Sequence, residues 1–223
     1  MHDERRLAHL IKTAALRPIR RAQRQGQGAS CPKALSDVDQ TVRVAASYPR
    51  DRSRCNDGVV PFRICFVCTG NICRSPMAEV VLRHQAGLFG MGALLAIDSA
   101  GTAADVGYGM DRRARDTLSR RGYDPGTHLG RQFEPAWLDE RDLVVALDTV
   151  HLQWLNNHAP KGSFTARVQL LMSFAGEWVQ SGNPLGVPDP YFGDEQDFES
   201  CLDLVEIGCE ALLSELSVEL AAP

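Results

Sequence analysis

The sequence contains no long hydrophobic run. Its 223 residues include no stretch of about eighteen apolar residues, the length that a membrane-spanning helix needs. It also lacks an apolar segment followed by a small-residue cleavage site near its start, the pattern of a secretory signal peptide. We therefore expect a soluble protein that works in the cytoplasm.

Cysteine patterns that hold metals or disulfides are missing as well. Seven cysteines are present, and three of them fall between Cys65 and Cys73. That clustering is unlike a secreted disulfide framework, and no pair of C-x-x-C units indicates a zinc site. We predict reduced thiols, no metal and no cofactor. The nucleotide-binding loop G-x-x-x-x-G-K-S/T is also absent, which argues against an ATPase.

Charge is divided unevenly along the chain. Residues 1–60 carry twelve Lys or Arg against six Asp or Glu, whereas residues 61–223 carry twelve against twenty-two, so the two parts have net charges of +6 and −10. This asymmetry predicts a basic, disordered N-terminal extension over 1–60 and an acidic domain over 61–220. Residues 4–24 could form a basic amphipathic helix that contacts nucleic acid or a membrane, although a solvated tail is the simpler interpretation.

Apolar runs alternate with helical patterns through the acidic domain. Apolar runs predict strands at 64–67, 94–97, 143–147 and 166–170, and helical spacing predicts helices at 77–88, 111–121, 134–139, 149–157 and 194–220. Strands that alternate with helices are typical of doubly wound α/β folds. We predict a single domain of this class, with a four-stranded parallel sheet flanked by helices and a ligand site at the carboxyl ends of the strands.

The stretch 64–79 has the pattern of a strand, a short loop and a helix start. Residues 64–67 are apolar and helical spacing resumes at Met77, so residues 68–75 form the connection. Free N–H groups in the first turn of a helix attract an anion, and Gly70 permits a backbone turn that a β-carbon would obstruct. The pattern therefore predicts a phosphate-binding loop directly after the first strand.

This loop carries a cysteine, an arginine and a serine. Cys68 and Arg74 are six positions apart, so a ring of backbone could place the thiol at its centre and the guanidinium at its rim, with a phosphate between them. Positive potential from the loop amides and Arg74 favours the thiolate, which is the nucleophilic form. Ser75 can donate a hydrogen bond to that thiolate, and the planar fork of Arg74 can hold two phosphate oxygens.

These residues resemble the signature of the low-molecular-weight protein tyrosine phosphatases, V-C-x-G-N-I-C-R-S-P, at the end of the first strand. The resemblance covers residues 61–217 and implies the family's fold. It implies that Cys68 is the nucleophile, Arg74 the phosphate clamp and Ser75 the residue that stabilises the thiolate. Asn71 would hold the loop in shape. The loop residues that would bind the substrate are Thr69, Gly70, Asn71, Ile72, Cys73 and Ser75, with the amides of Thr69 to Arg74 on the phosphate.

A second stretch, 186–193, is a rigid loop rich in Pro and Gly, which is suited to presenting a side chain. It contains Asp189 and Tyr191 in a D-P-Y segment similar to that of the family. By this resemblance Asp189 is the general acid that protonates the leaving oxygen and then activates water, and Tyr191 borders the substrate cleft. An Asp-Pro pair alone is more often a structural turn, so this assignment depends on the Cys68 loop.

Two further residues are expected to support the loop, and one expected residue is missing. The resemblance gives His128 and Ser99 the role of holding the catalytic loop, without proton transfer. The family's cleft wall usually carries an aromatic residue after the second strand, but here that position falls on Ala104 or Asp105. Tyr108 lies just beyond and could take its place. The sequence leaves substrate preference at this wall open.

Together these features predict a cysteine-dependent protein tyrosine phosphatase that acts on phosphotyrosine-containing proteins and small aryl phosphates through a phosphocysteine. An arsenate reductase on the same scaffold is one alternative, but residues 74–200 contain no cysteine for a thiol relay. Arginine phosphatases also resemble this loop, although they tend to carry Thr where Ile72 stands. A non-catalytic phosphoprotein-binding module would be indicated by loss of Cys68, Arg74 or Asp189, and all three are present.

Overall fold

The structure is a computed structural model that describes residues 60–162 and 164–221. The extension predicted over 1–60, with its helix at 4–24, lies outside the described residues apart from residue 60. The described elements are β1 (Phe62–Cys68), α2 (Arg74–Leu88), η2 (Gly92–Leu94), β2 (Leu95–Gly101), α3 (Arg112–Arg120), η3 (Pro135–Asp139), β3 (Leu143–Ala146), α4 (Thr149–His158), β4 (Arg167–Leu170), η4 (Leu171–Ser173), α5 (Gly176–Gln180) and α6 (Glu195–Ala221). No helix among them is both long and apolar enough to cross a membrane.

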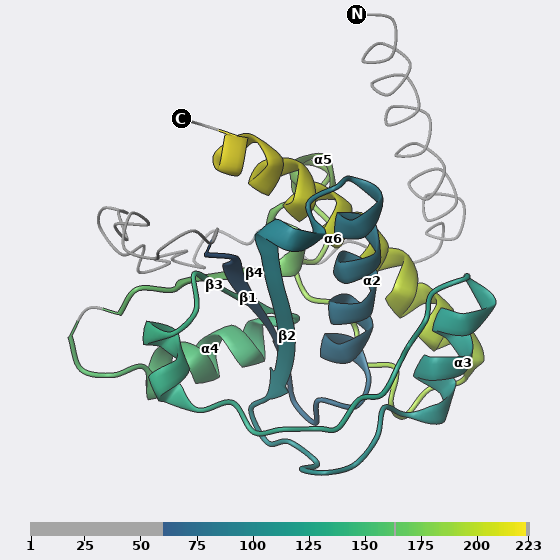
Figure 1. Cartoon of the computed structure of the whole chain (residues 1–223). Helices are drawn as coiled ribbons and strands as arrows, with labels where there is room; N and C mark the ends of the chain where they lie inside the picture. Colours follow the sequence, from purple (N-terminus) through teal and green to yellow (C-terminus); the bar gives the residue numbers. More distant parts are fainter. Residues whose placement is uncertain (1–59, 163, 222–223) are drawn as a thin grey trace, which may run out of the picture. The chain divides into compact units, whose positions relative to one another are not determined.

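The four strands form one parallel sheet in the order β2-β1-β3-β4 (Figure 1). β1 lies inside the sheet, where Cys65 is opposite Asp98 of β2 and Val144 of β3. Because β2 and β3 lie on opposite sides of β1, the strand order reverses between β1 and β3. In open α/β sheets ligands bind at the carboxyl ends of the strands at such a point, which here is the position of Cys68.

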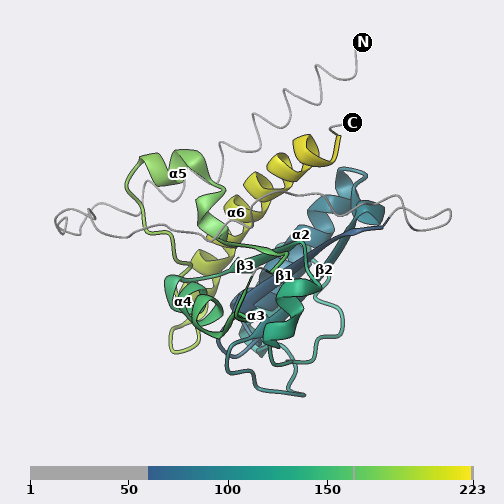
Figure 2. The same ribbon diagram turned by 90° about the vertical axis from the view of Figure 1, so that its left-hand side faces the viewer.

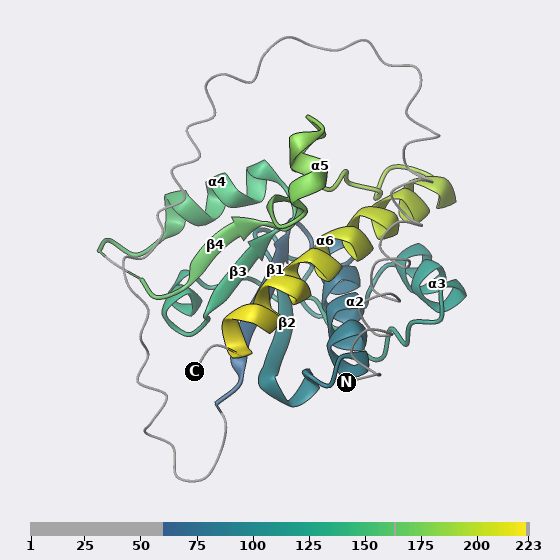
Figure 3. The same cartoon turned by 90° about the horizontal axis from the view of Figure 1, so that it is seen from above.

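Successive residues of β1 face opposite sides of the sheet. Ile64 and Phe66 belong to a core that includes residues of α2 and α6, whereas Cys65 and Val67 belong to a second core that includes residues of η3 and α4. Figures 1 and 3 show α2, α3 and α6 on one side of the sheet and α4 on the other, and in Figure 2 the α4 side faces the viewer. Both faces of the sheet are therefore covered, which explains why its central strands are almost wholly apolar.

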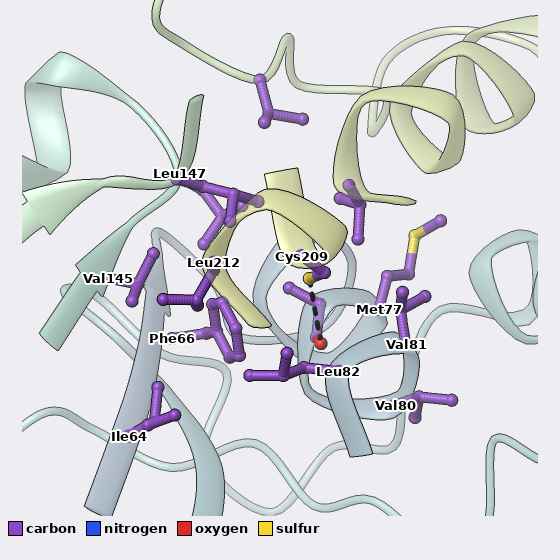
Figure 4. Close-up of a cluster of buried hydrophobic side chains, with 14 of the residues drawn as sticks. Ile64, Phe66, Met77, Val80, Val81, Leu82, Val145, Leu147, Cys209 and Leu212 are labelled. Atoms are coloured by element: carbon purple, nitrogen blue, oxygen red, sulfur yellow. Dashed lines mark hydrogen bonds between the residues drawn. The ribbon is translucent and has the colours of Figure 1, made fainter. Parts of the chain in front are cut away.

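The core between the sheet and helices α2 and α6 is shown in Figure 4. Phe66 of β1, Leu82 of α2 and Leu212 of α6 are all fully buried there. The thiol of Cys209 on α6 donates a hydrogen bond to the carbonyl oxygen of Ala78 on α2, at 3.7 Å. Cys209 is therefore a core residue that links the two helices.

The predicted doubly wound fold is confirmed, with shifts at the ends of its elements. The sequence predicts a second strand that ends near residue 97, but β2 continues to Gly101, because Gly101 still pairs with Cys68 on β1. α2 begins at Arg74, earlier than the predicted start at Met77. The short helices η2, η4 and α5 were not predicted from the sequence.

Candidate active site

The carbonyl groups of six successive residues hold the loop after β1 to its surroundings. The carbonyl oxygens of residues 68–73 all accept a hydrogen bond, at 2.7–3.1 Å. The donors, in order, are the amides of Thr102, Ala103 and Asp105, the imidazole of His128, and the amides of Asp111 and Met77. Residues of the chain that follows β2, together with Met77 of α2, therefore surround this loop and orient its backbone.

The N–H groups of the same loop have the opposite orientation. Because a trans peptide group carries its N–H on the side away from its C=O, the outward carbonyls of 68–73 turn the amides of 69–74 towards the inside of the loop. None of these six amides donates a hydrogen bond to a residue that the structure describes. Together with the N-terminus of α2 they form a ring of partial positive charge, which can bind a tetrahedral anion such as phosphate.

Cys68 and Ser75 lie side by side at the buried base of the loop. Sγ of Cys68 is 2.9 Å from Oγ of Ser75. This oxygen accepts an N–H from the Asn71 side chain at 2.9 Å, so its own hydrogen can go either to the sulfur or to the more distant carbonyl of Ala100, at 3.3 Å. The Ser75 hydroxyl is therefore placed to donate to the sulfur of Cys68, and hydrogen bonds to an anion are the stronger ones.

Asn71 combines an unusual backbone angle with several side-chain hydrogen bonds. It is fully buried and is the one non-glycine residue of the described ranges with a positive φ, 56°. Its side-chain N–H groups donate to Ser75 and Ser99, and its Oδ1 accepts the amide of Arg131 at 3.0 Å. Ser99 in turn donates to Glu79 at 2.6 Å. These bonds offset the cost of the left-handed backbone and place Ser99 beside the loop.

Gly70 provides space in the turn, as the sequence predicts. A β-carbon on Gly70 would lie 3.0 Å from Oδ2 of Asp105, so glycine makes room for a neighbouring carboxylate. The positive φ of the turn lies at the next residue, Asn71. The tighter constraint is at Gly101 at the end of β2, where a β-carbon would overlap the carbonyl oxygen of Thr69.

Replacement of Gly101 by alanine should damage this loop without changing any of its residues. The added methyl group would overlap the Thr69 oxygen and lie 3.0 Å from the β-carbon of Ala104, so the backbone has to move. We expect the free energy of unfolding to fall by about 1–3 kcal/mol. We expect kcat/KM for p-nitrophenyl phosphate to fall roughly 10- to 100-fold, because misplaced groups lose their alignment with the reacting atoms. Chemical denaturation and steady-state kinetics measure the two effects.

Gly87→Ala is the matched control for that change. A β-carbon on Gly87, in the last turn of α2, meets nothing within 4 Å. Its turnover should equal that of the parent, and its free energy of unfolding should stay the same or rise by up to about 1 kcal/mol. If both variants keep full turnover, close packing of Gly101 on Thr69 is not required by the loop.

Arg74 connects the loop to two acidic residues from distant parts of the chain. Its side chain is only 4% exposed. Nη1 donates to the carbonyl oxygen of Val187 at 3.3 Å and lies 3.8 Å from Oδ2 of Asp148, while Nη2 donates to Oδ2 of Asp189 at 2.7 Å. The structure thus brings Arg74 against Asp189, 115 positions further along the chain.

Arg113 of α3 holds the loop that carries Asp189. Its guanidinium donates to the carbonyl oxygens of Tyr191, at 2.9 Å, and Gly193, at 3.0 Å, and lies 5.7 Å from the centre of the Tyr191 ring. The Tyr191 amide donates to Oδ1 of Asp189 at 3.2 Å. Tyr191 is 42% exposed, and its ring meets that of Phe192 edge to face at 5.0 Å. An accessible carboxylate and an aromatic ring therefore share one loop beside Arg74.

His151 of α4 approaches the loop of residues 68–75 from the side of β3. Its Nε2 lies 2.9 Å from Oγ1 of Thr69, whereas its Nδ1 has no hydrogen-bond partner among the described residues. The residue is 1% exposed. Burial, reinforced by the charge of Arg74, lowers the pKa of His151 to about 4. The imidazole is therefore neutral at physiological pH.

The other cysteines near the loop are buried thiols. Burial raises the pKa of Cys201 to about 12, and it also raises the pKa values of Cys65 and Cys73 above the usual range of a thiol. All five cysteines of the described ranges are free, and within those ranges no group of three or more His, Cys, Asp or Glu side chains is arranged to hold a metal ion. Protonated thiols are poor nucleophiles, so Cys65, Cys73 and Cys201 are unsuited to attack a phosphoryl group.

The wall of the loop next to β2 is polar. Asp105 donates its amide to the carbonyl oxygen of Gly70 at 3.0 Å and carries its carboxylate beside that glycine. Ala104 donates its amide to the side chain of Gln132 at 3.0 Å. Tyr108 is 71% exposed. At the two positions where the family resemblance implies an aromatic residue, the chain thus presents a methyl group and a carboxylate.

Two residues that contact the loop residues were not predicted as site residues. Asp148 caps α4, since its side chain accepts the amide of Thr149. His151 lies one turn further along α4. A usable signal was their position just after β3, because β3 pairs with β1 and its carboxyl end adjoins Cys68. Arg113 had no such signal, since its bond to Tyr191 joins positions 78 residues apart.

Comparison with known proteins gives one consistent family. The family model of the low molecular weight phosphotyrosine protein phosphatases matches residues 63–222. A low molecular weight protein-tyrosine-phosphatase of Streptomyces coelicolor is 46% identical over 154 residues, which are 69% of this chain and 92% of the relative.

Solved structures agree with this match. YfkJ from Bacillus subtilis is 32% identical, with a TM-score of 0.65 over 72% of this chain and 97% of its own. A YwlE arginine phosphatase, solved as a Cys-to-Ser mutant with a phosphorylated active-site serine, is 26% identical, with a TM-score of 0.61 over 70% of this chain and 96% of its own. From the family match, these relatives and the loop around Cys68, we conclude that the chain belongs to the low molecular weight phosphotyrosine protein phosphatase family.

Proposed function

We propose that the chain hydrolyses phosphotyrosine in proteins, and small aryl phosphates, through a phosphocysteine at Cys68. The observation that carries this proposal is the loop of residues 68–74, in which six carbonyls bond outward and six amides face inward around the cysteine. Amides held in this way need no reorganisation when negative charge develops on the phosphoryl oxygens. The loop therefore suits phosphoryl transfer to its own cysteine.

In the first step Sγ of Cys68 attacks phosphorus in line, and the bond between phosphorus and the aryl oxygen breaks. Asp189 gives its proton to that oxygen, while the loop amides and Arg74 hold the three equatorial oxygens. Arg74 donates to Asp189 in the structure, so a phosphoryl group competes with this carboxylate for the guanidinium. The exchange would release Asp189 to take up a proton and face the leaving oxygen.

In the second step water attacks the phosphorus of the phosphocysteine. Asp189, now ionised, accepts a proton from this water, the bond between sulfur and phosphorus breaks, and inorganic phosphate leaves. Ser75 supports both steps, because its hydroxyl lies 2.9 Å from the sulfur and can stabilise the thiolate that attacks and later departs. The phosphorylated active-site serine of the YwlE mutant supports a covalent intermediate at the corresponding position.

Phosphotyrosine is the substrate class that we infer from the names of the relatives and from the loop at Asp189. The Streptomyces coelicolor relative and the family model are both named for tyrosine phosphatases. Tyr191 presents a partly exposed ring next to Asp189, which suits an aromatic leaving group. We place the reaction in the cytoplasm, where a catalytic thiol stays reduced.

Phosphoarginine is the alternative substrate, because one of the similar solved structures is an arginine phosphatase. The YwlE arginine phosphatase shares the fold at 26% identity, against 46% for the Streptomyces coelicolor phosphatase. Ile72 also favours phosphotyrosine, since arginine phosphatases tend to carry Thr at this position. Arsenate reduction is disfavoured because the pKa of about 12 leaves Cys201 protonated and unable to act as a resolving thiolate.

The test is kcat/KM of the full chain on a phosphotyrosyl peptide in mildly acidic buffer with EDTA, compared with a phosphoarginine peptide and with arsenate plus a small thiol. We expect phosphotyrosine to be preferred by at least about tenfold, a difference of about 1.4 kcal/mol between transition states. Faster hydrolysis of phosphoarginine, or thiol-dependent arsenate reduction without phosphatase activity, would overturn the assignment. Phosphate binding without any turnover would indicate a phosphoprotein-binding module.

A further inference from the structure

Thr69 occupies the variable position of the loop signature V-C-x-G-N-I-C-R-S-P, directly after the nucleophile. Its side chain lies on the exposed rim of the loop, and its hydroxyl meets a residue from another element. Oγ1 of Thr69 is 2.9 Å from Nε2 of His151, which lies in the first turn of α4. The question that this contact raises is which of the two groups donates the hydrogen.

The buried surroundings of His151 answer that question. Its Nδ1 has no partner among the described residues. If Nδ1 carried the hydrogen, a buried N–H would be left without an acceptor. An unpaired buried N–H is rarer and more costly than an unpaired buried lone pair. With the hydrogen on Nε2, Nδ1 has only a lone pair. Nε2 then donates to Thr69, and the hydroxyl of Thr69 keeps its own hydrogen for another acceptor.

Burial, together with the charge of Arg74, keeps His151 in this neutral form. Burial and the positive charge of Arg74 lower the pKa of His151. The carboxylates of Asp148 and Asp189 raise it, but they offset only part of this decrease. The pKa of about 4 means that His151 does not gain a proton between pH 5 and pH 8. It is therefore suited to hold a neighbouring group in position, and not to transfer protons in that range.

We propose that His151 positions the hydroxyl of Thr69 as a further hydrogen-bond donor to the phosphoryl group of the substrate. Thr69 directly follows Cys68 in the loop, and the inward amides and Arg74 attract anionic oxygens to this loop, so a phosphoryl oxygen is the acceptor that we assign to the hydrogen of the hydroxyl. The inference rests on the proposed function and extends it: Thr69 would bind through its side chain as well as its amide, and His151 acts through Thr69.

Inorganic phosphate is the probe for this contact, because it binds the loop without any turnover. Thr69→Val removes the hydroxyl at constant shape and should raise the Kd for phosphate about tenfold, as expected for one hydrogen bond to an anion. Thr69→Ser keeps a hydroxyl and should lose clearly less affinity than Thr69→Val. Isothermal titration of the full chain measures both. Equal Kd values for the parent and Thr69→Val would overturn the proposal.

The dependence on His151 is tested by a second pair of variants and a double mutant. His151→Gln retains an N–H near the position of Nε2 and should keep more phosphate affinity than His151→Leu, which has none. If the imidazole acts through the hydroxyl, His151→Leu in a Thr69→Val background should cause no further loss of affinity. An additional loss would mean that His151 acts independently. His158→Gln, an exposed histidine at the other end of α4, should bind phosphate like the parent.

Two readouts separate this positioning role from a structural one and from failure of the proposed function. Nitrogen-15 NMR of the histidines should show His151 neutral with its hydrogen on Nε2 throughout pH 5–8; a hydrogen on Nδ1 would overturn the proposal. The pH profile of kcat/KM should keep its shape in His151→Gln, and loss of a limb between pH 5 and 8 would show that His151 titrates in the reaction. If the parent hydrolyses no aryl phosphate while Thr69→Val still weakens phosphate binding, the proposed function fails and this contact stands.

Discussion

Replacement of Cys68 by serine should abolish hydrolysis of aryl phosphates while the fold and the phosphate site persist. Loss of a nucleophile costs on the order of 10⁴- to 10⁶-fold in kcat, and a serine hydroxyl remains protonated where the thiol can ionise. The substitution is nearly isosteric, and Cys68 is buried beside Ser75, so the backbone of the loop should not move. kcat/KM for p-nitrophenyl phosphate, Kd for inorganic phosphate and the denaturation midpoint measure the three expectations.

Cys209→Ser makes the same chemical change in the core between α2 and α6. Its new hydroxyl can donate to the carbonyl oxygen of Ala78, as the thiol does, so it should fold and turn over like the parent. If Cys68→Ser keeps turnover comparable to that of Cys209→Ser, the nucleophile lies elsewhere. If it also loses phosphate binding, the serine has disturbed the loop, and the kinetic loss does not report on the nucleophile alone.

Replacement of Asp189 by asparagine should lower kcat for phosphotyrosyl peptides about 10²- to 10⁴-fold, the usual contribution of a general acid. The loss should be much smaller for p-nitrophenyl phosphate, whose leaving group is a weak base and needs little help from a proton donor. In the parent, Arg74 donates to Oδ2 of Asp189 at 2.7 Å. The asparagine oxygen can still accept this hydrogen bond, so Arg74 should keep its place and phosphate binding should remain. Parallel kinetics on the two substrates measure the difference.

Asp194→Asn is the matched control, a carboxylate-to-amide change five positions further along the same loop. Asp194 accepts the amide of Gln196 at 2.8 Å near the start of α6, and asparagine caps helices about as well as aspartate. Its kcat should equal that of the parent for both substrates. An equal loss for phosphotyrosine and p-nitrophenyl phosphate in Asp189→Asn would contradict a proton-donor role and would indicate a role in positioning Arg74.

The part of the site that could be predicted from the sequence consists of residues that lie close together along the chain. Cys68, Arg74 and Ser75 lie within one short loop, so their spacing alone predicts a thiol enclosed by amides and a guanidinium. The apolar runs at 64–67 and 143–147 predict strands buried on both faces, and the structure confirms them as β1 and β3. Local patterns of this kind suffice where strand, turn and helix follow one another directly, because the same few residues form both the element and the site.

The remaining features of the site depend on contacts between segments that are distant in the sequence, and no local sequence pattern encodes such contacts. The positive φ falls at Asn71 and not at Gly70, because bonds to Ser75, Ser99 and Arg131 hold that backbone. The placement of the Asp105 carboxylate beside the loop follows from the bond between its amide and the carbonyl oxygen of Gly70. The amides of the loop face inward because donors from residues 102–128, together with Met77 of α2, bind its carbonyls. Apart from the bond to Met77, that orientation exists only once β1, β2 and the chain after them are packed together.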